Sequence, residues 1–336
     1  MGQPLVSVVV PVYREGPLLR DTIESVMEQT FKEFEIILVD NNADEISIAI
    51  LSEYVRKFPN VIRVISQKIQ GAPSARNKGI LESRGKYIAM LEGDDILYPK
   101  RLEKQVEAFE KEKGDISLLS SRFDFVDWSN NKILSKGIEE KNFWMESLKL
   151  QGIFRSHPST WFFDRQKAID LGLFNEAFNP RLVEDDEFNF RMFLEGRLLC
   201  LQESLVRVRL PSKEYKIIKD SQASSVNVLS KLNLFFDILK NRLSEKKEIL
   251  YDKKGFSKIR SQWLREQGVG FLSYENGKKI GRKFLLDALK EDIGDYKNWK
   301  LYFRSFYKNF KSDTQINLSD KDVKYLFENI FFNKDV

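Results

Sequence analysis

Residues 6–40 read VSVVVPVYREGPLLRDTIESVMEQTFKEFEIILVD, in which two apolar, β-branched runs flank an amphipathic segment. The two runs predict buried strands, and the apolar spacing over about 18–29 predicts a helix. The alternation continues with a helix over about 46–58, the run VIRVIS, a helix near 74–83 and the run KYIAML. Strands separated by helices of this length imply right-handed crossovers. We therefore predict an α/β fold with a mostly parallel, doubly wound, Rossmann-like sheet.

The pattern is less regular after this first part of the chain. We expect a charged helix over about 100–111 and an acid-rich helix over about 184–195, with short strands near 117–125, 160–163 and 198–209. Beyond Val226 we expect only helices, with breaks near Gly255, Gly277, Gly294 and Asp313. The predicted domains are residues 1–215, with halves of about 1–125 and 126–215, and a helical C-terminal region, 216–336, after a linker near 215–226.

Composition excludes several classes of protein. The chain has 336 residues, one cysteine (Cys200) and one histidine (His157), so it has no internal disulfide framework and no cysteine/histidine cluster for structural zinc. The apolar run Leu5–Val12 is far shorter than the roughly 20 residues that a membrane-spanning helix needs. We expect a cytoplasmic protein, with peripheral contact at the inner face of the membrane as an option.

Several candidate site residues lie where the predicted strands end. Pro11, Asp40 and Asp94 each fall just past the end of a predicted strand, and the carboxyl ends of parallel strands meet at one edge, where ligands bind. Asp94 and Asp95, in LEGDDILYP, offer hard oxygen ligands that suit Mg²⁺ or Mn²⁺ bridging a pyrophosphate. The alternative is a turn and helix cap, for which aspartate is also favoured.

Three further features are candidates for function. Four acids at 184–187 begin a predicted helix, which is more than helix capping requires. Arg76, in QGAPSARNKGI, begins a helix where free backbone N–H groups and a guanidinium could face phosphate; the alternative is a solvated surface arginine. His157 and Glu184 are candidates for an acceptor site, although a lone histidine before proline is more often structural.

Six ordered pieces together resemble the family-two glycosyltransferases with the GT-A fold. They span about Val6 to Arg209: VSVVVPVYRE, ESVMEQTFKEFEIILVDNNA, GAPSARNKGILESRGKYIAMLEGDD, YPKRLEKQ, GLFNE and VEDDEFNFR. The resemblance implies transfer of a sugar from a nucleoside diphosphate to an acceptor hydroxyl with inversion, dependent on Mn²⁺ or Mg²⁺. It also implies a glycan or lipid-linked acceptor and a role in cell-surface polysaccharide or glycolipid synthesis.

The resemblance also assigns roles to residues. Asp185 matches the catalytic base, and Asp94 and Asp95 match the metal motif. The nucleotide-sugar site would contain Pro11, Tyr13, Asp40, Asn41, Arg76, Glu92 and Asp94. Two positions depart from the usual pattern, because the family usually has Asp at Glu92 and often has Asp at Asn41. An amide can donate as well as accept, which weakens the preference for the uracil edge. Uridine stays the first choice of base, with thymidine and guanosine left open.

Two other functions remain as alternatives. A sugar-phosphate nucleotidyltransferase shares a related topology, but such enzymes usually carry a glycine-rich basic loop where this chain has PVYREGP. The second alternative is a member of the family that binds a nucleotide sugar without catalysis. It is suggested by Glu92 and Asn41, which depart from the family's usual pattern.

The C-terminal region carries excess positive charge. Residues 226–336 contain 23 basic and 15 acidic side chains, with aromatics interleaved with lysines in WKLYFRSFYKNFK. One interpretation is a surface that contacts an anionic membrane; the favoured alternative is a helical appendage whose aromatics pack inward. Nucleic-acid binding is not expected, because the interspersed acids dilute the positive field.

Overall fold

The computed structural model describes residues 2–112, 116–138, 156–179, 183–210, 228–245, 253–272 and 278–305. These residues fall into two compact units, with the division between Asn241 and Arg242. The first unit holds the sheet and the candidate site. The predicted break at Asp313 lies outside the described residues.

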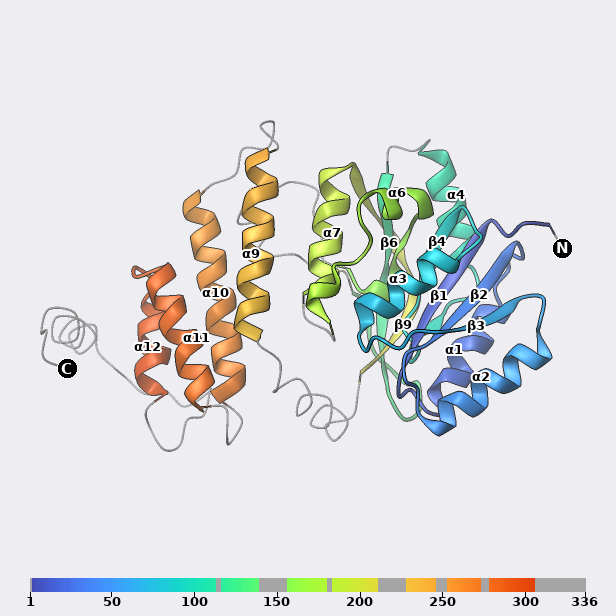
Figure 1. Cartoon of the computed structure of the whole chain (residues 1–336), viewed down its shortest axis with the longest axis horizontal. Helices are drawn as coiled ribbons and strands as arrows, with labels where there is room; N and C mark the ends of the chain where they lie inside the picture. Colours follow the sequence, from blue (N-terminus) through green and yellow to red (C-terminus); the bar gives the residue numbers. More distant parts are fainter. Residues whose placement is uncertain are drawn as a thin grey trace, which may run out of the picture. The chain divides into compact units, whose positions relative to one another are not determined.

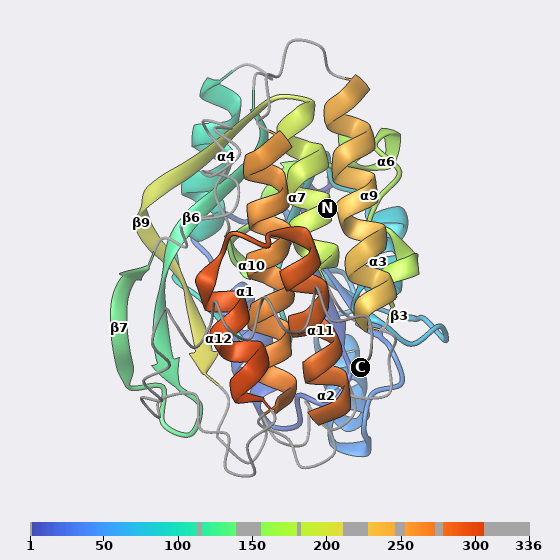
Figure 2. The same cartoon turned by 90° about the vertical axis from the view of Figure 1, so that its left-hand side faces the viewer.

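One sheet forms the centre of the first unit (Figure 1). Within the described residues it has nine strands, in the order β3-β2-β1-β4-β8-β6-β9-β5, with β7 pairing only with β6 (Figure 2). Strands β1 to β4 pair in parallel, β8 is antiparallel to both neighbours, and β6 and β9 pair in parallel again. The strand bounds are β1 (Val6–Val12), β2 (Phe34–Asp40), β3 (Ile62–Ser66), β4 (Tyr87–Met90), β5 (Ile96–Leu97), β6 (Ile116–Asp127), β7 (Ile133–Ile138), β8 (Phe162–Asp164) and β9 (Arg197–Leu210).

Helices cover both faces of this sheet, as predicted. Alternate residues of β1 point to opposite faces, which divides the core in two: Val8 packs with one apolar cluster and Val9 with the other. The first cluster includes apolar residues of α1 (Leu18–Met27), α2 (Glu45–Lys57) and α4 (Arg101–Lys111). The second includes residues of α3 (Ala72–Glu82), α6 (Arg165–Asp170) and α7 (Glu184–Leu194). In Figure 1, α3 crosses in front of the strands and α7 stands at their left side.

The predicted α/β fold and its early elements are confirmed, with corrections in detail. Pro11 lies within β1, paired with Val39, rather than beyond the strand. Thr160 belongs to a 3₁₀ turn, Pro158–Thr160, that precedes β8. The two-residue strand β5 and the strand β7 were not predicted, because neither has a long apolar run.

The described residues from Arg242 onward are helical. The helices are the end of α9 (Val228–Glu245), then α10 (Lys253–Leu272), α11 (Lys278–Glu291) and α12 (Tyr296–Arg304). The break predicted near Gly255 is confirmed, because α9 ends at Glu245 and α10 begins at Lys253, two residues before this glycine. The break at Gly294 is confirmed between α11 and α12, and Gly277 lies outside the described residues.

Three aromatic residues of α12 pack inward, whereas Tyr296 at the start of this helix is exposed. Trp299 is buried and packs on Leu289, with Tyr302 and Phe303 against the same cluster. This favours the helical appendage for α12, while the remainder of the aromatic stretch lies outside the described residues. No helix among the described residues is both long and apolar enough to cross a membrane.

Candidate active site

The predicted site residues of the first half gather at one edge of the sheet. Val12 pairs with Asp40 and Val9 with Met90, so β1, β2 and β4 end side by side. Tyr13, Asn41 and the acidic turn Glu92–Asp95 follow these strand ends directly. The parallel register therefore brings together residues that are separated by decades of sequence.

Hydrogen bonds to the buried carboxylate of Asp95 hold the acidic turn in place. Asp95 is 1% exposed and accepts the hydroxyl of Ser159 at 2.5 Å and the backbone N–H of Arg209 at 3.0 Å. Ser159 in turn accepts the backbone N–H of Glu92 at 3.0 Å. Asp94 is half-buried, and its carbonyl accepts an N–H of the Arg209 side chain at 2.8 Å. The two carboxylates therefore sit on a turn that is fixed on both sides.

Burial first, and the neighbouring charge of Asp94 second, raise the pKa of Asp95 well above its ordinary value. A cation at the turn would relieve this repulsion, so the donor chemistry fits a divalent metal. Among the described residues, no group of three or more His, Cys, Asp or Glu side chains could hold an ion by itself. A metal held by these two carboxylates would need phosphate oxygens and water as its remaining ligands.

Arg76 joins the acidic turn to helix α7. Its guanidinium donates to Glu92 at 2.7 Å and to Glu184 at 3.2 Å, and it lies 5.2 Å from the centre of the Phe174 ring. Arg76 is 4% exposed, so it is not the solvated surface arginine of the alternative interpretation. Burial alone would lower the pKa of Arg76, but Glu92 and Glu184 more than offset burial and raise it.

The four acids of α7 have different surroundings. Glu184 pairs with Arg76, Glu187 pairs with Arg191 at 2.7 Å, and Asp186 is 4% exposed. Asp185 is half-exposed, and its carboxylate accepts the N–H of Asp186 at 2.9 Å. Asp185 is thus the member of the cluster that an acceptor could reach.

The residue before these acids has an unusual backbone. Val183 has a φ of 55°, in the left-handed region that β-branched side chains rarely adopt. Strain of this kind persists where surrounding contacts hold it, and it is common beside active sites. Here the strained residue, Val183, is the N-cap of α7.

Asp40 and Asn41 shape the loop that follows β3. Asp40 accepts the N–H of Ala43 at 2.9 Å. The amide of Asn41 donates to the carbonyls of Gln67 and Ile69 at 2.8 and 2.7 Å, and accepts from Gly71 and Gln70 at 2.8 and 3.3 Å. All four hydrogen-bonding positions of Asn41 are therefore used inside the chain, so its predicted contact with a base would require one of them to be released.

Tyr13 and His157 lie beside this edge. Tyr13 is half-buried, and its backbone N–H donates to Glu15 at 2.6 Å. His157 accepts the N–H of Ser159 through Nδ1 at 3.3 Å and lies 3.5 Å from the carboxylate of Asp95. His157 therefore caps the 3₁₀ turn next to the acidic turn. The acceptor-site assignment of His157 and of the 2%-exposed Glu184 stays a prediction.

Sequence reasoning missed three residues that support the acidic turn. Ser159 and Arg209 contact it directly, and the side chain of Arg209 also reaches Asp21 at 2.5 Å. Arg101 is fully buried and donates to the carbonyls of Met90 and Trp161; burial lowers the pKa of Arg101 to about 9, against the opposing charge of Asp95. The sequence held only a weak signal for two of them: Arg101 lies in an otherwise ordinary helix, α4, and Arg209 in an otherwise ordinary strand, β9.

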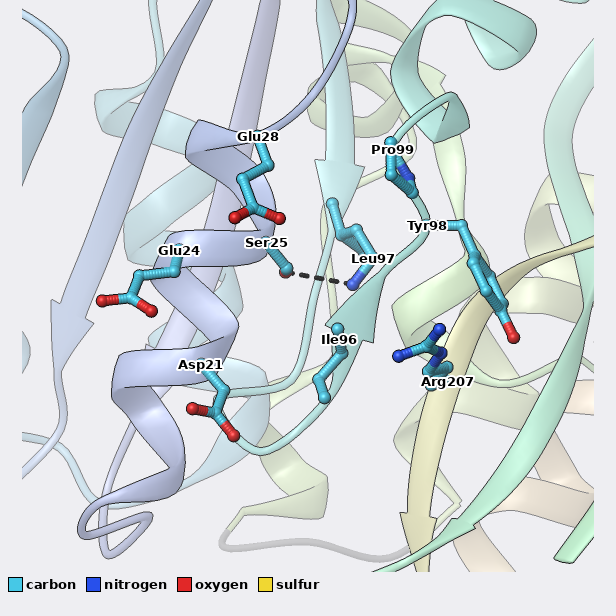
Figure 3. Close-up of a pocket in the computed structure, with 9 residues that line it drawn as sticks. All are labelled: Asp21, Glu24, Ser25, Glu28, Ile96, Leu97, Tyr98, Pro99 and Arg207. Carbon is cyan, nitrogen blue, oxygen red and sulfur yellow. Dashed lines mark hydrogen bonds between the residues drawn. The ribbon is translucent and has the colours of Figure 1, made fainter. Parts of the chain in front are cut away.

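A pocket of about 280 Å³ lies on α1, β5 and β9 (Figure 3). Asp21, Glu24 and Glu28 line it from α1, and Arg207 lies 4.6 Å from the centre of the Tyr98 ring on the other side. Ser25 accepts the N–H of Leu97 at 3.0 Å, which ties β5 to α1. None of the predicted site residues lines this pocket, which borders the acidic turn through Ile96 and through Asp21, a partner of Arg209.

We predict that replacing Arg76 by methionine lowers the free energy of unfolding by about 3 kcal/mol, because it leaves the carboxylates of Glu92 and Glu184 without this cation. Lys78→Met, which breaks the exposed pair with Glu82 on the same helix, is the matched control, with an expected loss below about 1 kcal/mol. Urea unfolding measures both variants. Equal losses for Arg76→Met and Lys78→Met would contradict the role of Arg76 as a buried bridge.

Solved structures with a similar fold are glycosyltransferases. Staphylococcus aureus TarS residues 1–349 in complex with UDP-GlcNAc matches with a TM-score of 0.58 at 18% identity, covering 89% of this chain and 84% of that one. GalNAc-T7 with UDP, GalNAc and Mn²⁺ matches with a TM-score of 0.54 at 19% identity, covering 63% and 45%. At these identities the likeness establishes the fold, which is the GT-A fold of glycosyltransferases.

Sequence relatives narrow the class to a family. Residues 7–172 match the family Glycosyl transferase family 2. The uncharacterized glycosyltransferase MJ1057 of Methanocaldococcus jannaschii is 33% identical over 221 residues, 64% of this chain and 73% of that protein. The putative glycosyltransferase EpsE of Bacillus subtilis is 34% identical over 221 residues, covering 63% and 76%. The chain belongs to glycosyl transferase family 2.

Proposed function

We propose that this protein transfers a sugar from a nucleoside diphosphate, with UDP as the first choice, to a hydroxyl of a glycan or lipid-linked acceptor. The observation that carries the proposal is the ion-paired link Glu184–Arg76–Glu92, which connects the acidic turn to the helix that presents Asp185. A donor at the turn and an acceptor at Asp185 would then share one site. The UDP-GlcNAc complex of TarS supports a nucleotide-sugar donor.

In the proposed reaction Asp185 removes the proton of the acceptor hydroxyl. The hydroxyl oxygen forms a bond to the anomeric carbon as the bond to the diphosphate breaks, so the configuration inverts and the electron pair leaves with the nucleoside diphosphate. Arg76 would bind the diphosphate or base. A divalent cation held by Asp94 and Asp95 would supply positive charge against the leaving diphosphate. The Mn²⁺ in GalNAc-T7 supports this cofactor.

Product analysis with a donor panel tests this function. The panel contains UDP-glucose, UDP-galactose, UDP-N-acetylglucosamine, UDP-N-acetylgalactosamine, and one dTDP- and one GDP-sugar, each with Mn²⁺, Mg²⁺ or chelator. We expect metal-dependent release of the nucleoside diphosphate from one donor through slow hydrolysis, which needs no acceptor. Pyrophosphate release would instead favour a nucleotidyltransferase. Donor binding without turnover, even with several glycan acceptors, would favour the non-catalytic alternative.

A further inference from the structure

Lys231 is a buried lysine outside the part of the chain that matches the family. It lies in the first turn of α9, well after residue 172, where the family match ends. Lys231 is 8% exposed, whereas Lys240 on the same helix is exposed. A buried ammonium is costly unless it is paired or hydrogen-bonded, so its surroundings need an explanation.

The ammonium of Lys231 donates to two backbone carbonyls of one short segment. Its Nζ contacts the carbonyl of Phe178 at 3.1 Å and also that of Asn179. These two residues end a 3₁₀ turn, Glu176–Phe178, shortly before Val183 and the acids of α7. Because carbonyls take two of its three donor positions, Lys231 is arranged to hold the chain at this point.

Charge also connects Lys231 to the candidate site. Burial lowers the pKa of Lys231, and the negative charge of Glu184 acts in the opposite direction. Glu184 in turn binds Arg76, which binds Glu92 in the acidic turn. The charge of Lys231 is therefore favoured by Glu184, which Arg76 joins to the acidic turn.

The segment that Lys231 holds also contacts the first turn of α3. The side-chain oxygen of Asn179 accepts the N–H and the hydroxyl of Ser74, both at 3.4 Å. It lies so close to Gly71 that a Cβ there would be 2.0 Å away. Gly71 has a φ of 149°, so a larger residue there would also strain the backbone. Asn179 thus lies between Lys231 and the helix that carries Arg76.

We propose that Lys231 is a positioning residue for glycosyl transfer, which fixes the segment before α7 and so sets where Asp185 stands relative to the donor. This makes the beginning of α9 a part of the catalytic unit. The inference rests on the proposed function. It does not require Lys231 to touch the donor or the acceptor.

The test compares Lys231→Met, which keeps the length of the side chain without its donors, with Lys231→Arg, which keeps a cation and several donors. Lys240→Met is the matched control from the exposed side of α9. For each variant, kcat and KM are measured with the UDP-sugar that the wild-type protein hydrolyses with Mn²⁺. Calorimetry measures UDP binding, and hydrogen–deuterium exchange measures backbone protection.

We expect Lys231→Met to lower kcat on the order of 10²-fold, because a displacement of about 1 Å at a catalytic group has an effect of this size. KM and UDP affinity should stay within about threefold, and Lys231→Arg should recover most of the lost kcat. Faster hydrogen exchange should be confined to the segment around Asn179 and the first turn of α7. Lys240→Met should behave as the wild type.

Three results would overturn the inference. The first is a kcat for Lys231→Met within about twofold of the wild type. The second is an equal loss in Lys231→Met and Lys231→Arg, which would indicate sensitivity to size alone. The third is general loss of protection or of UDP binding in Lys231→Met, which would make Lys231 a structural residue only. A wild-type protein that releases no UDP from any donor would instead refute the proposed function itself, and the inference with it.

Discussion

Replacing Asp185 by asparagine should lower the rate of glycosyl transfer by roughly 10²–10⁴-fold, the usual contribution of a general base. The amide keeps the size of the carboxylate and an oxygen that can accept the N–H of Asp186, so the start of α7 should keep its structure. It cannot accept the acceptor proton. Affinity for UDP should stay within about threefold, because the proposed role of Asp185 concerns the acceptor.

The control for Asp185→Asn is Asp170→Asn, which removes an exposed carboxylate of α6 that accepts a hydrogen bond from the amide of Gln166. Its transfer rate should match that of the wild type. A rate for Asp185→Asn within about tenfold of the control would exclude Asp185 as the base. Loss of UDP binding in Asp185→Asn would instead indicate that α7 had moved.

Replacing Asp95 by asparagine should separate metal binding from folding. The amide oxygen can still accept the backbone N–H of Arg209, and the amide N–H can donate to the hydroxyl of Ser159, so the melting temperature without metal should change little. Removing a ligand should weaken the metal-dependent part of UDP binding by at least about 10–100-fold, since disturbing an outer-shell partner alone costs this much. Turnover should fall at least in parallel.

Calorimetry of UDP binding with Mn²⁺ and with chelator measures this effect. In the wild type, Mn²⁺ should tighten UDP binding; in Asp95→Asn the two titrations should agree. A variant that still binds UDP more tightly with Mn²⁺ than with chelator would contradict a metal site at Asp95. Asp170→Asn again serves as the control, with the metal effect of the wild type.

Local pattern was sufficient to predict most of the first half of the fold. Strands β1 to β4 are apolar runs separated by helices, and parallel pairing alone then places Asp40 and the acidic turn at one edge. The short strand β5 could not be predicted in this way, because its two residues owe their pairing to β9, more than a hundred residues later. Register in the second half depends on such distant partners.

The candidate site was predictable where it consists of side chains displayed from strand ends. Arg76 was found from its place at the start of a helix, and Asp185 was assigned through the resemblance. Their roles depend on partners that sequence spacing does not reveal, such as Glu184 for Arg76. Lys231 could not be found, since a lysine in an amphipathic helix looks like a solvated one. Its burial results from tertiary packing of α9 against the segment that ends at Asn179.

Time-resolved proton NMR of donor turnover tests the central claim most directly. The wild-type protein is mixed with Mn²⁺ and the α-linked UDP-sugar that it hydrolyses, and the anomeric proton of the released sugar is followed before mutarotation. The account predicts that UDP and the β anomer appear first, and that both disappear with chelator and in Asp185→Asn. First appearance of the α anomer, or release of pyrophosphate and a sugar phosphate, would contradict it.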